Sequence, residues 1–358
     1  MTRNGLHSTP GFGALVISLD FEIHWGVRYR YDAHGEYRAN LLGVRRAVPE
    51  MLREFARYDV AATWATVGFL FARSRDELRQ FSPAIRPAYT DPTLSPYDEP
   101  LGETEADDPL HYAPTFIDAI VAAPRQELAT HTFSHYYCLE AGQDRAAFRA
   151  DMASANAIAR QRGLTFRSIV FPRNQHNPDY DDVLLDAGIR CIRGNTLGWM
   201  NRITRVEGST LPMRVGRVLN AYAPVNGQPT IPWRGILRPS GLCDVPASLF
   251  VRPYSPSLRR FDAVRLRRIA GMMRRAAMAN EIVHLYWHPH NFGLHLEESI
   301  VFLRGILEAF ARLRDSHGLR SISMGEVAET VTGADQARVG SVAGADRGDA
   351  RRSFTIAS

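Results

Sequence analysis

Short apolar runs rich in β-branched residues alternate along this chain with longer segments in which apolar residues recur at helical spacing. The first run, Ala14 to Leu19, is followed at once by charged and aromatic residues, as expected where a buried strand ends. The apolar runs predict strands at residues 14–19, 59–67, 127–130, 166–171, 189–192, 282–287 and 320–323.

The segments between these runs predict amphipathic helices, because their apolar positions would share one helical face. Pro49 is expected to kink or restart the first of these helices, since proline lacks the backbone N–H that a helix interior uses. Helices are expected at residues 41–58, 73–81, 115–123, 144–162, 181–187, 262–279, 296–314 and 324–331.

Two stretches break the alternation of strands and helices. Residues 82–114 are dense in Pro, Asp, Thr and Tyr, and residues 195–257 are dense in Pro and Gly. Long stretches of this kind inside a domain are usually functional insertions. We predict one domain over residues 1–332 that carries these two insertions, followed by a tail at residues 333–358 whose low apolar content predicts disorder.

Polar side chains cluster directly after the first, third, fourth and sixth predicted strands. A closed or nearly closed (β/α) barrel brings the carboxyl ends of many parallel strands, and their polar residues, to one mouth. A doubly wound open sheet gathers such residues only near a switch point, and no glycine-rich phosphate loop supports one here. The pattern therefore favours a barrel with its site at that mouth.

The 358-residue length and the 45% apolar content allow a substantial core. The net charge of +5 comes entirely from Arg, because the chain contains no Lys. Arg is the better bidentate partner for carboxylate and phosphate, so an anionic substrate or a lipid surface fits; a basic surface that maintains solubility is the alternative. No basic run with interleaved aromatic residues occurs, which argues against nucleic acid.

The cysteines Cys138, Cys191 and Cys243 are odd in number and have no paired spacing, which favours a reducing compartment. Residues 1–13 contain no apolar stretch of signal-peptide length, and no window approaches the roughly 20 apolar residues of a membrane span. We therefore expect a cytoplasmic protein.

Candidate chemistry begins with Asp20 and Glu22. Residues two apart on an extended strand face the same way, so both carboxylates can reach one point. His131 and His135 are four apart and would project from one face of a helical turn. Two histidines and one carboxylate complete a site for Zn²⁺ or a similar divalent ion, although histidines at this spacing also occur as ordinary core or surface residues.

These segments together resemble the polysaccharide deacetylase family, the NodB-homology hydrolases of carbohydrate esterase family four. Asp20-Phe21-Glu22 resembles a variant of the family's first motif in which one residue separates the two acids. His131 and His135 match the second motif, Phe171-Pro172-Arg173 matches the third in place, and the segment Leu285 to Pro289 resembles the last.

The resemblance implies a distorted (β/α)7-type barrel and assigns roles to the matched residues. Asp20 would be the general base and His288 the general acid, while Arg173 would hold Asp20 ionised and oriented. The divalent metal, with Zn²⁺ as the first expectation, would have three ligands: Glu22, His131 and His135.

Other polar and aromatic residues near these motifs are candidates for binding substrate. Each has a structural alternative: a buried histidine bonded to the backbone, core packing for tryptophan, or a turn cap for asparagine. The candidates are His24, Trp25, Asn174, Asn177, His290 and Asn291.

The resemblance predicts a metal-dependent hydrolase that removes an N-acetyl or N-formyl group from an amino sugar. The expected substrate is a lipid-linked or nucleotide-linked intermediate of a bacterial-type surface polysaccharide or lipopolysaccharide O-antigen, handled in the cytoplasm with peripheral membrane contact allowed. Two alternatives stay open: a hydrolase of non-sugar cyclic amides on the same barrel, and an inactive glycan-binding protein that retains the metal.

Overall fold

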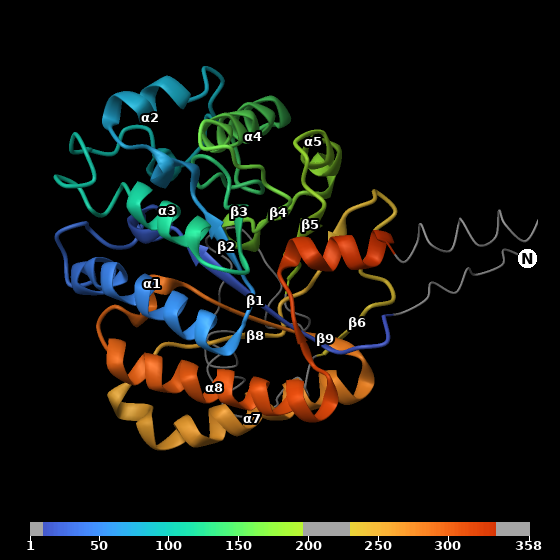
Figure 1. Cartoon of the computed structure of the whole chain (residues 1–358). Coiled ribbons are helices and arrows are strands. Elements are labelled where there is room, and N and C mark those ends of the chain that lie inside the picture. The colour runs from blue at the N-terminus through green and yellow to red at the C-terminus, as the bar shows by residue number, and fades with distance from the viewer. Residues whose placement is uncertain (1–9, 196–229, 334–358) are drawn as a thin grey trace, which may run out of the picture.

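The computed structural model describes residues 10–195 and 230–333, which form a curled sheet wrapped by helices (Figure 1). The predicted tail from residue 334 and residues 196–229 of the second predicted insertion lie outside this part of the chain.

Every strand predicted from the sequence is present, and all pairings among these strands are parallel. Starting from β9, the sheet runs β9-β1-β2-β3-β4-β5, and β10 also pairs with β1. Their bounds are β1 (Ala14–Phe21), β2 (Ala62–Thr66), β3 (Gln126–Thr130), β4 (Ser168–Ile169), β5 (Cys191–Ile192), β9 (Glu281–Trp287) and β10 (Arg320–Ser321).

Three further strands lie where the sequence predicted only an insertion: β6 (Ile231–Pro232), β7 (Cys243–Asp244) and β8 (Leu249–Phe250). β6, which was not among the predicted strands, is antiparallel to β9. β7 pairs with β5, and β8 pairs with β9. Residues 243–250 therefore join the two ends of the curled sheet, and the predicted distorted barrel is confirmed.

The predicted helices are also present. α1 continues through Pro49 without a restart. Caps set two of the starts, because Ser74 accepts a hydrogen bond from the Glu77 amide and Asp144 accepts one from the Ala147 amide. Residues 324–333 are helical. The bounds of the others are α1 (Arg38–Tyr58), α2 (Arg75–Phe81), α3 (Pro114–Ala122), α4 (Arg145–Arg160), α5 (Asp181–Asp186), α7 (Asp262–Ala279) and α8 (Leu296–His317).

The helices cover the outside of the barrel, with α1, α7 and α8 on one side and α2 to α5 on the other (Figure 1). None of the described helices is both long enough and apolar enough to cross a membrane. Residues 82–113 contain one short 3-10 helix, Pro92–Leu94, and otherwise run as an irregular loop.

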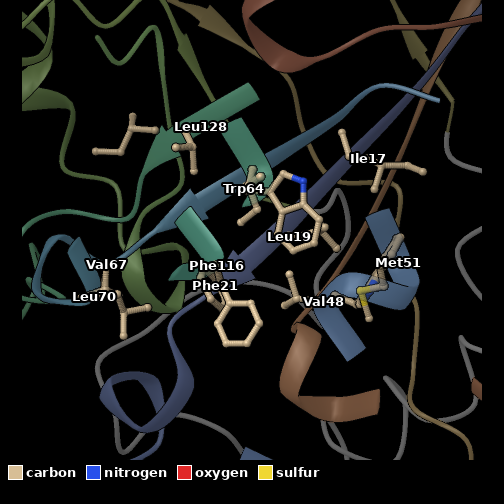
Figure 2. Close-up of a cluster of buried hydrophobic side chains, with 14 of the residues drawn as sticks. Ile17, Leu19, Phe21, Val48, Met51, Trp64, Val67, Leu70, Phe116 and Leu128 are labelled. Atoms are coloured by element: carbon tan, nitrogen blue, oxygen red, sulfur yellow. The ribbon is translucent and has the colours of Figure 1, made fainter. Parts of the chain in front are cut away.

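The alternation of side chains along β1 decides what faces the barrel interior. Ile17, Leu19 and Phe21 point outward into a cluster with residues of α1 and α3 (Figure 2). Ala14 and Val16 belong to a separate inner cluster of mostly small side chains from neighbouring strands. Because the side-chain period of a strand is two, Ser18 and Asp20 continue this inner face. Along β1 the inner face therefore changes from apolar to polar towards the carboxyl end.

A buried carboxylate ties the strands together at the end opposite Asp20. Glu127 of β3 accepts hydrogen bonds from the hydroxyls of Thr63 on β2 (2.8 Å) and Ser168 on β4 (2.7 Å). It also accepts one from the Gly325 amide (2.9 Å), which anchors the last helix. One side chain therefore satisfies donors from three elements.

Glu127→Ala should lower the free energy of unfolding by about 3 kcal/mol, because it leaves three buried donors unpaired at about 1 kcal/mol each. Denaturant unfolding followed by circular dichroism measures this change. Glu308→Ala, on the exposed face of α8, is the control and should stay within about 0.5 kcal/mol of the wild type. A Glu127→Ala protein as stable as this control would contradict the assignment.

Candidate metal centre

Glu22 stands just beyond β1, and a glycine makes room for it. Its side chain is buried, and a Cβ atom at Gly26 would lie only 1.9 Å from the Glu22 Cδ atom. Any larger residue at position 26 would displace this carboxylate. The 3-10 helix Ile23–Gly26 between them turns the chain back over the barrel mouth.

His131 and His135 follow β3, but they do not lie on the predicted helical turn. Thr132 (φ 63°) and His135 (φ 58°) adopt left-handed backbone conformations, so residues 131–135 form a bent loop. Asp151 of α4 holds this loop by accepting hydrogen bonds from the amides of Phe133 (2.7 Å) and Ser134 (3.1 Å). The histidines converge because of this loop rather than through helical spacing.

The Glu22, His131 and His135 side chains bring three potential ligand atoms together. Glu22 Oε2 lies 3.2 Å from His131 Nε2 and 3.1 Å from His135 Nε2. Two ligands of a tetrahedral Zn²⁺ would be about 3.3 Å apart, given metal–nitrogen distances of about 2.0–2.1 Å. These residues form a group of the right type and spacing to bind a metal ion.

The hydrogen bond on the far side of His131 sets which ring nitrogen faces Glu22. His131 Nδ1 donates to the Val170 carbonyl oxygen (2.8 Å), so Nε2 faces the Glu22 carboxylate, where it can take a metal ion or a proton. Two electron-pair donors in contact repel unless a cation lies between them. Burial lowers the pKa of His135 to about 4, which keeps that ring neutral, as a metal ligand must be.

His24, Glu99 and His111 form a second group of potential ligand atoms. The ring nitrogens of His24 and His111 are 2.8 Å apart, which is a hydrogen-bond distance and shorter than the about 3.3 Å expected across a tetrahedral metal. The other ring nitrogen of His24 lies 2.9 Å from the Tyr31 carbonyl oxygen. This group therefore acts as an internal link.

The prediction that His24 and Trp25 bind substrate is wrong. Both are buried, and neither lines the cavity at the barrel mouth. The Trp25 indole donates to the His111 carbonyl oxygen (3.0 Å), so its polar atom is also satisfied inside the protein. Asn177 is likewise outside the cavity, because its side chain caps a turn by accepting a hydrogen bond from the Asp179 amide (3.1 Å).

Arg193, not Arg173, holds Asp20. The Arg193 guanidinium donates to both Asp20 oxygens, at 2.5 and 2.8 Å, and to the Asn174 side-chain oxygen at 2.8 Å. Burial favours a raised pKa for Asp20, but the Arg193 charge and hydrogen bonds outweigh it and lower the pKa below its ordinary value. Asp20 is therefore ionised at neutral pH.

Arg173 lies elsewhere in the same cavity. Its guanidinium carbon is 3.9 Å from the ring centroid of Tyr29 and 4.7 Å from that of Tyr137. Stacking on an aromatic face contributes about 2 kcal/mol when water is excluded, whereas burial of an ion costs several kcal/mol. The assignment of Arg173 as the partner of Asp20 is thus corrected. Arg193 directly follows the strand predicted at 189–192, and this position could have marked it as a candidate site residue.

His288 faces both carboxylates from the end of β9. Its Nε2 atom is 3.5 Å from Asp20 Oδ2 and 3.4 Å from Glu22 Oε1, and 26% of its side chain is exposed to the cavity. The Asn291 amide nitrogen lies 3.5 Å from His288 Nδ1, and this group can only donate. The proton of a neutral His288 therefore belongs on Nε2, next to the carboxylates.

The cavity at the barrel mouth has a volume of about 500 Å³, within the usual range for small-ligand sites. Loop residues Tyr29, Arg30 and Tyr31 form part of its wall, and Phe250 of β8 forms another part. Burial lowers the pKa of His290 to about 3, so this ring is a neutral wall residue. Predicted site residues that line it are Asp20, Glu22, His135, Arg173, Asn174, His288, His290 and Asn291.

Comparison with solved structures decides the fold family. A Mycobacterium smegmatis protein classed as a polysaccharide deacetylase superposes with a TM-score of 0.56 at 13% identity, over 91% of this chain and 93% of that one. PuuE allantoinase superposes with a TM-score of 0.50 at 12% identity, over 91% and 93%. No family model matches the sequence, and no curated protein matches it.

The chain has the polysaccharide deacetylase fold.

The polysaccharide deacetylase fold explains why residues far apart in sequence meet here. Glu22, His131 and His288 each follow the carboxyl end of a parallel strand: β1, β3 and β9. In a curled parallel sheet these ends lie around one mouth, so each strand delivers a polar side chain to the same space. This arrangement places two carboxylates, three histidines and three arginines around one cavity.

His131→Ala should lose the bound divalent metal that the wild-type protein retains after dialysis, because it removes one of three ligands. Elemental analysis of the purified proteins measures metal per chain. His317→Ala, on the exposed end of α8, is the matched control and should keep the wild-type content. Equal metal in all three proteins would show that the metal, if any, binds elsewhere.

Asp151→Asn should weaken metal affinity by about 10- to 100-fold without removing a ligand, because the loop between the two histidines loses its anchor. Competition with a chromogenic chelator gives the affinity. Asp186→Asn on α5 is the control, since Asp186 is exposed and pairs only with Arg149 among the described residues. Unchanged affinity in Asp151→Asn would contradict the anchoring role.

Proposed function

We propose that this protein is a metal-dependent N-deacylase that hydrolyses an N-acetyl or N-formyl amide on an amino sugar. The observation that carries the proposal is that Asp20 and His288 line one cavity next to the Glu22, His131 and His135 group. A base, an acid and a set of metal ligands then surround the space where an acyl group would bind.

Glu22, His131 and His135 would hold a divalent ion, which would supply Lewis-acid chemistry to a water molecule and to the acyl carbonyl. We propose Zn²⁺, which suits two imidazoles and one carboxylate. The structural support for a cation is the convergence of His131 Nε2 and His135 Nε2 on one oxygen of Glu22, at 3.2 and 3.1 Å.

Asp20 is the proposed general base. Its two oxygens are fixed by Arg193, which keeps the carboxylate ionised and aimed at the cavity. Asp20 accepts the proton of the attacking water as the new carbon–oxygen bond forms. Fixed orientation offsets part of the loss of basicity that a neighbouring cation causes.

His288 is the proposed general acid. In its imidazolium form His288 presents an Nε2 proton to the cavity and returns to the neutral ring when it gives that proton up; the amide nitrogen of the substrate departs poorly unless it is protonated. Transfer of this proton as the carbon–nitrogen bond breaks releases a free amine and a carboxylate. Asn291, which contacts Nδ1 of His288, holds the ring in this orientation.

The finer proposals concern substrate and location. Aromatic walls from Tyr29 and Phe250 suit the faces of a sugar ring, while Asn174, His290 and Asn291 offer polar groups to its hydroxyls. We propose an intermediate of surface polysaccharide or O-antigen assembly, linked to a lipid or a nucleotide, as the substrate. A cytoplasmic site of action is supported by the cysteines, all buried and free.

The decisive assay measures acetate and formate released from N-acetyl and N-formyl amino sugars by the Zn²⁺-loaded protein. Asp20→Asn should reduce the rate by about 10²- to 10⁴-fold while it retains metal, because the base is lost and no ligand is removed. Asp315→Asn on the exposed surface of α8 is the control and should keep full activity.

The same assay includes small cyclic amides such as cyclic ureides. Hydrolysis of these compounds alone would reject the sugar deacylase in favour of the cyclic-amide hydrolase. Bound metal without turnover of any compound would reject both enzymes and leave the glycan-binding protein.

A further inference from the structure

Among the described residues, the Arg173 guanidinium has no hydrogen-bond partner and no ion-pair partner. Its three guanidinium nitrogens are shielded from solvent and make no hydrogen bond within residues 10–195 and 230–333. The rings of Tyr29 and Tyr137 hold the group in place. Ring faces attract a cation, but they do not satisfy the five N–H donors of a guanidinium. The donors therefore lack partners in a region where an unpaired donor is costly.

The acids that line the cavity are not partners of Arg173. They are Asp20 and Glu22. Both acids already have partners: Asp20 pairs with Arg193, and Glu22 contacts two histidines. Neither carboxylate is left to neutralise Arg173, so the cavity is suited to an anion from outside.

The backbone at Arg173 is shaped to keep the side chain in this position. Arg173 (φ 53°) and Asn174 (φ 54°) are both left-handed, which is uncommon for residues other than glycine. Such conformations persist where the surroundings over-determine them, and they cluster at ligand clamps. The turn directs Asn174 to Arg193 and Arg173 to the two tyrosines.

We propose that Arg173 binds an oxyanion, a carboxylate or a phosphate, that the substrate carries beside its acylated nitrogen. The proposal rests on the deacylase function and narrows its substrate class to acidic amino sugars. A guanidinium fork pairs with both oxyanions through two parallel hydrogen bonds. Neutral hydroxyls could not compensate the charge.

The contact of Tyr137 with His135 sets where the oxyanion lies. The Tyr137 hydroxyl is 3.1 Å from His135 Nδ1, and its ring stacks on Arg173. Arg173 is thus separated from a metal ligand by one aromatic side chain. The oxyanion must belong to the acylated sugar itself or to its immediate substituent, such as a C6 carboxylate or a C1 phosphate, and not to a distant part of a polymer.

The test compares three N-acetylated glucosamine derivatives: the neutral methyl glycoside, its C6 uronate and the 1-phosphate. For the wild type, kcat/KM should be at least about 10-fold higher on one of the acidic sugars. Arg173→Gln should lower kcat/KM on that sugar by about 10- to 100-fold and leave the neutral sugar within about 3-fold. Arg173→Lys keeps the charge but lacks the two parallel N–H donors of the guanidinium. Its kcat/KM on the acidic sugar should lie between the values for the wild type and Arg173→Gln.

Arg86→Gln is the matched control, because Arg86 stacks on Tyr97 at 4.1 Å in the same way but does not line the cavity. It should behave as the wild type on all three sugars. The acidic sugar that responds to Arg173→Gln identifies the oxyanion as carboxylate or phosphate. An equal loss on acidic and neutral sugars, or no acidic preference in the wild type, overturns the proposal.

Calorimetric binding to the wild type needs no variant and no turnover. Glucosamine 1-phosphate or glucosaminuronic acid should bind at least about 10-fold more tightly than glucosamine methyl glycoside. Binding of the acidic sugars that depends on Arg173, without hydrolysis of any sugar, would keep the oxyanion site and reject the deacylase. Hydrolysis with no preference for the acidic sugars would keep the deacylase and reject the oxyanion site. Equal binding of the three sugars overturns the oxyanion site.

Discussion

The Arg193 guanidinium is the interaction on which the interior of this barrel depends. It donates to Asp20 and Ser18 of β1 and to Asn174 beyond β4, while its own position follows β5. A buried ion pair contributes little net stability while intact, but removal of one partner costs about 3–5 kcal/mol because the other charge is left uncompensated. Asp20 can stay buried and ionised only because this cation lies opposite it.

The same network reaches the segment that closes the barrel. The Ser18 hydroxyl, which accepts from Arg193, lies 2.9 Å from His284 Nε2, and His284 Nδ1 donates to the Val245 carbonyl oxygen (3.2 Å). Burial, assisted by the Arg193 charge, lowers the pKa of His284 to about 3, so this ring relays hydrogen bonds as a neutral group. The orientation of Asp20 and the closure of the barrel at residues 243–250 are therefore parts of one arrangement.

The same features explain how far the sequence could predict the site. Asp20, Glu22 and His288 follow long apolar runs, so their place at the strand ends could be predicted from patterning alone. Arg193 directly follows one predicted strand, Arg173 comes one residue after another, and the pattern does not say which of them faces β1. Which arginine faces β1 depends on how the barrel closes. The strands that close it, β7 and β8, have only two residues each, too few for an alternation of apolar and polar residues to be recognised. The bent loop at 131–135 could not be predicted from local sequence either, because Asp151, which holds it, lies on a later helix.

The wall of the cavity is fixed before any ligand arrives. Arg28 donates to the carbonyl oxygens of Thr93 (2.8 Å) and Leu94, and the His24–His111 contact joins the same two loops a second time. Residues 82–114 are therefore tied to the loop after β1, and they support from outside the part of the cavity wall that Tyr29, Arg30 and Tyr31 of that loop form. A preformed wall spares the ordering cost of binding, but it cannot relax around a ligand of the wrong shape or charge. A polar group that the wall leaves unpaired, such as the Arg173 guanidinium, then favours ligands that can pair with it and disfavours the others.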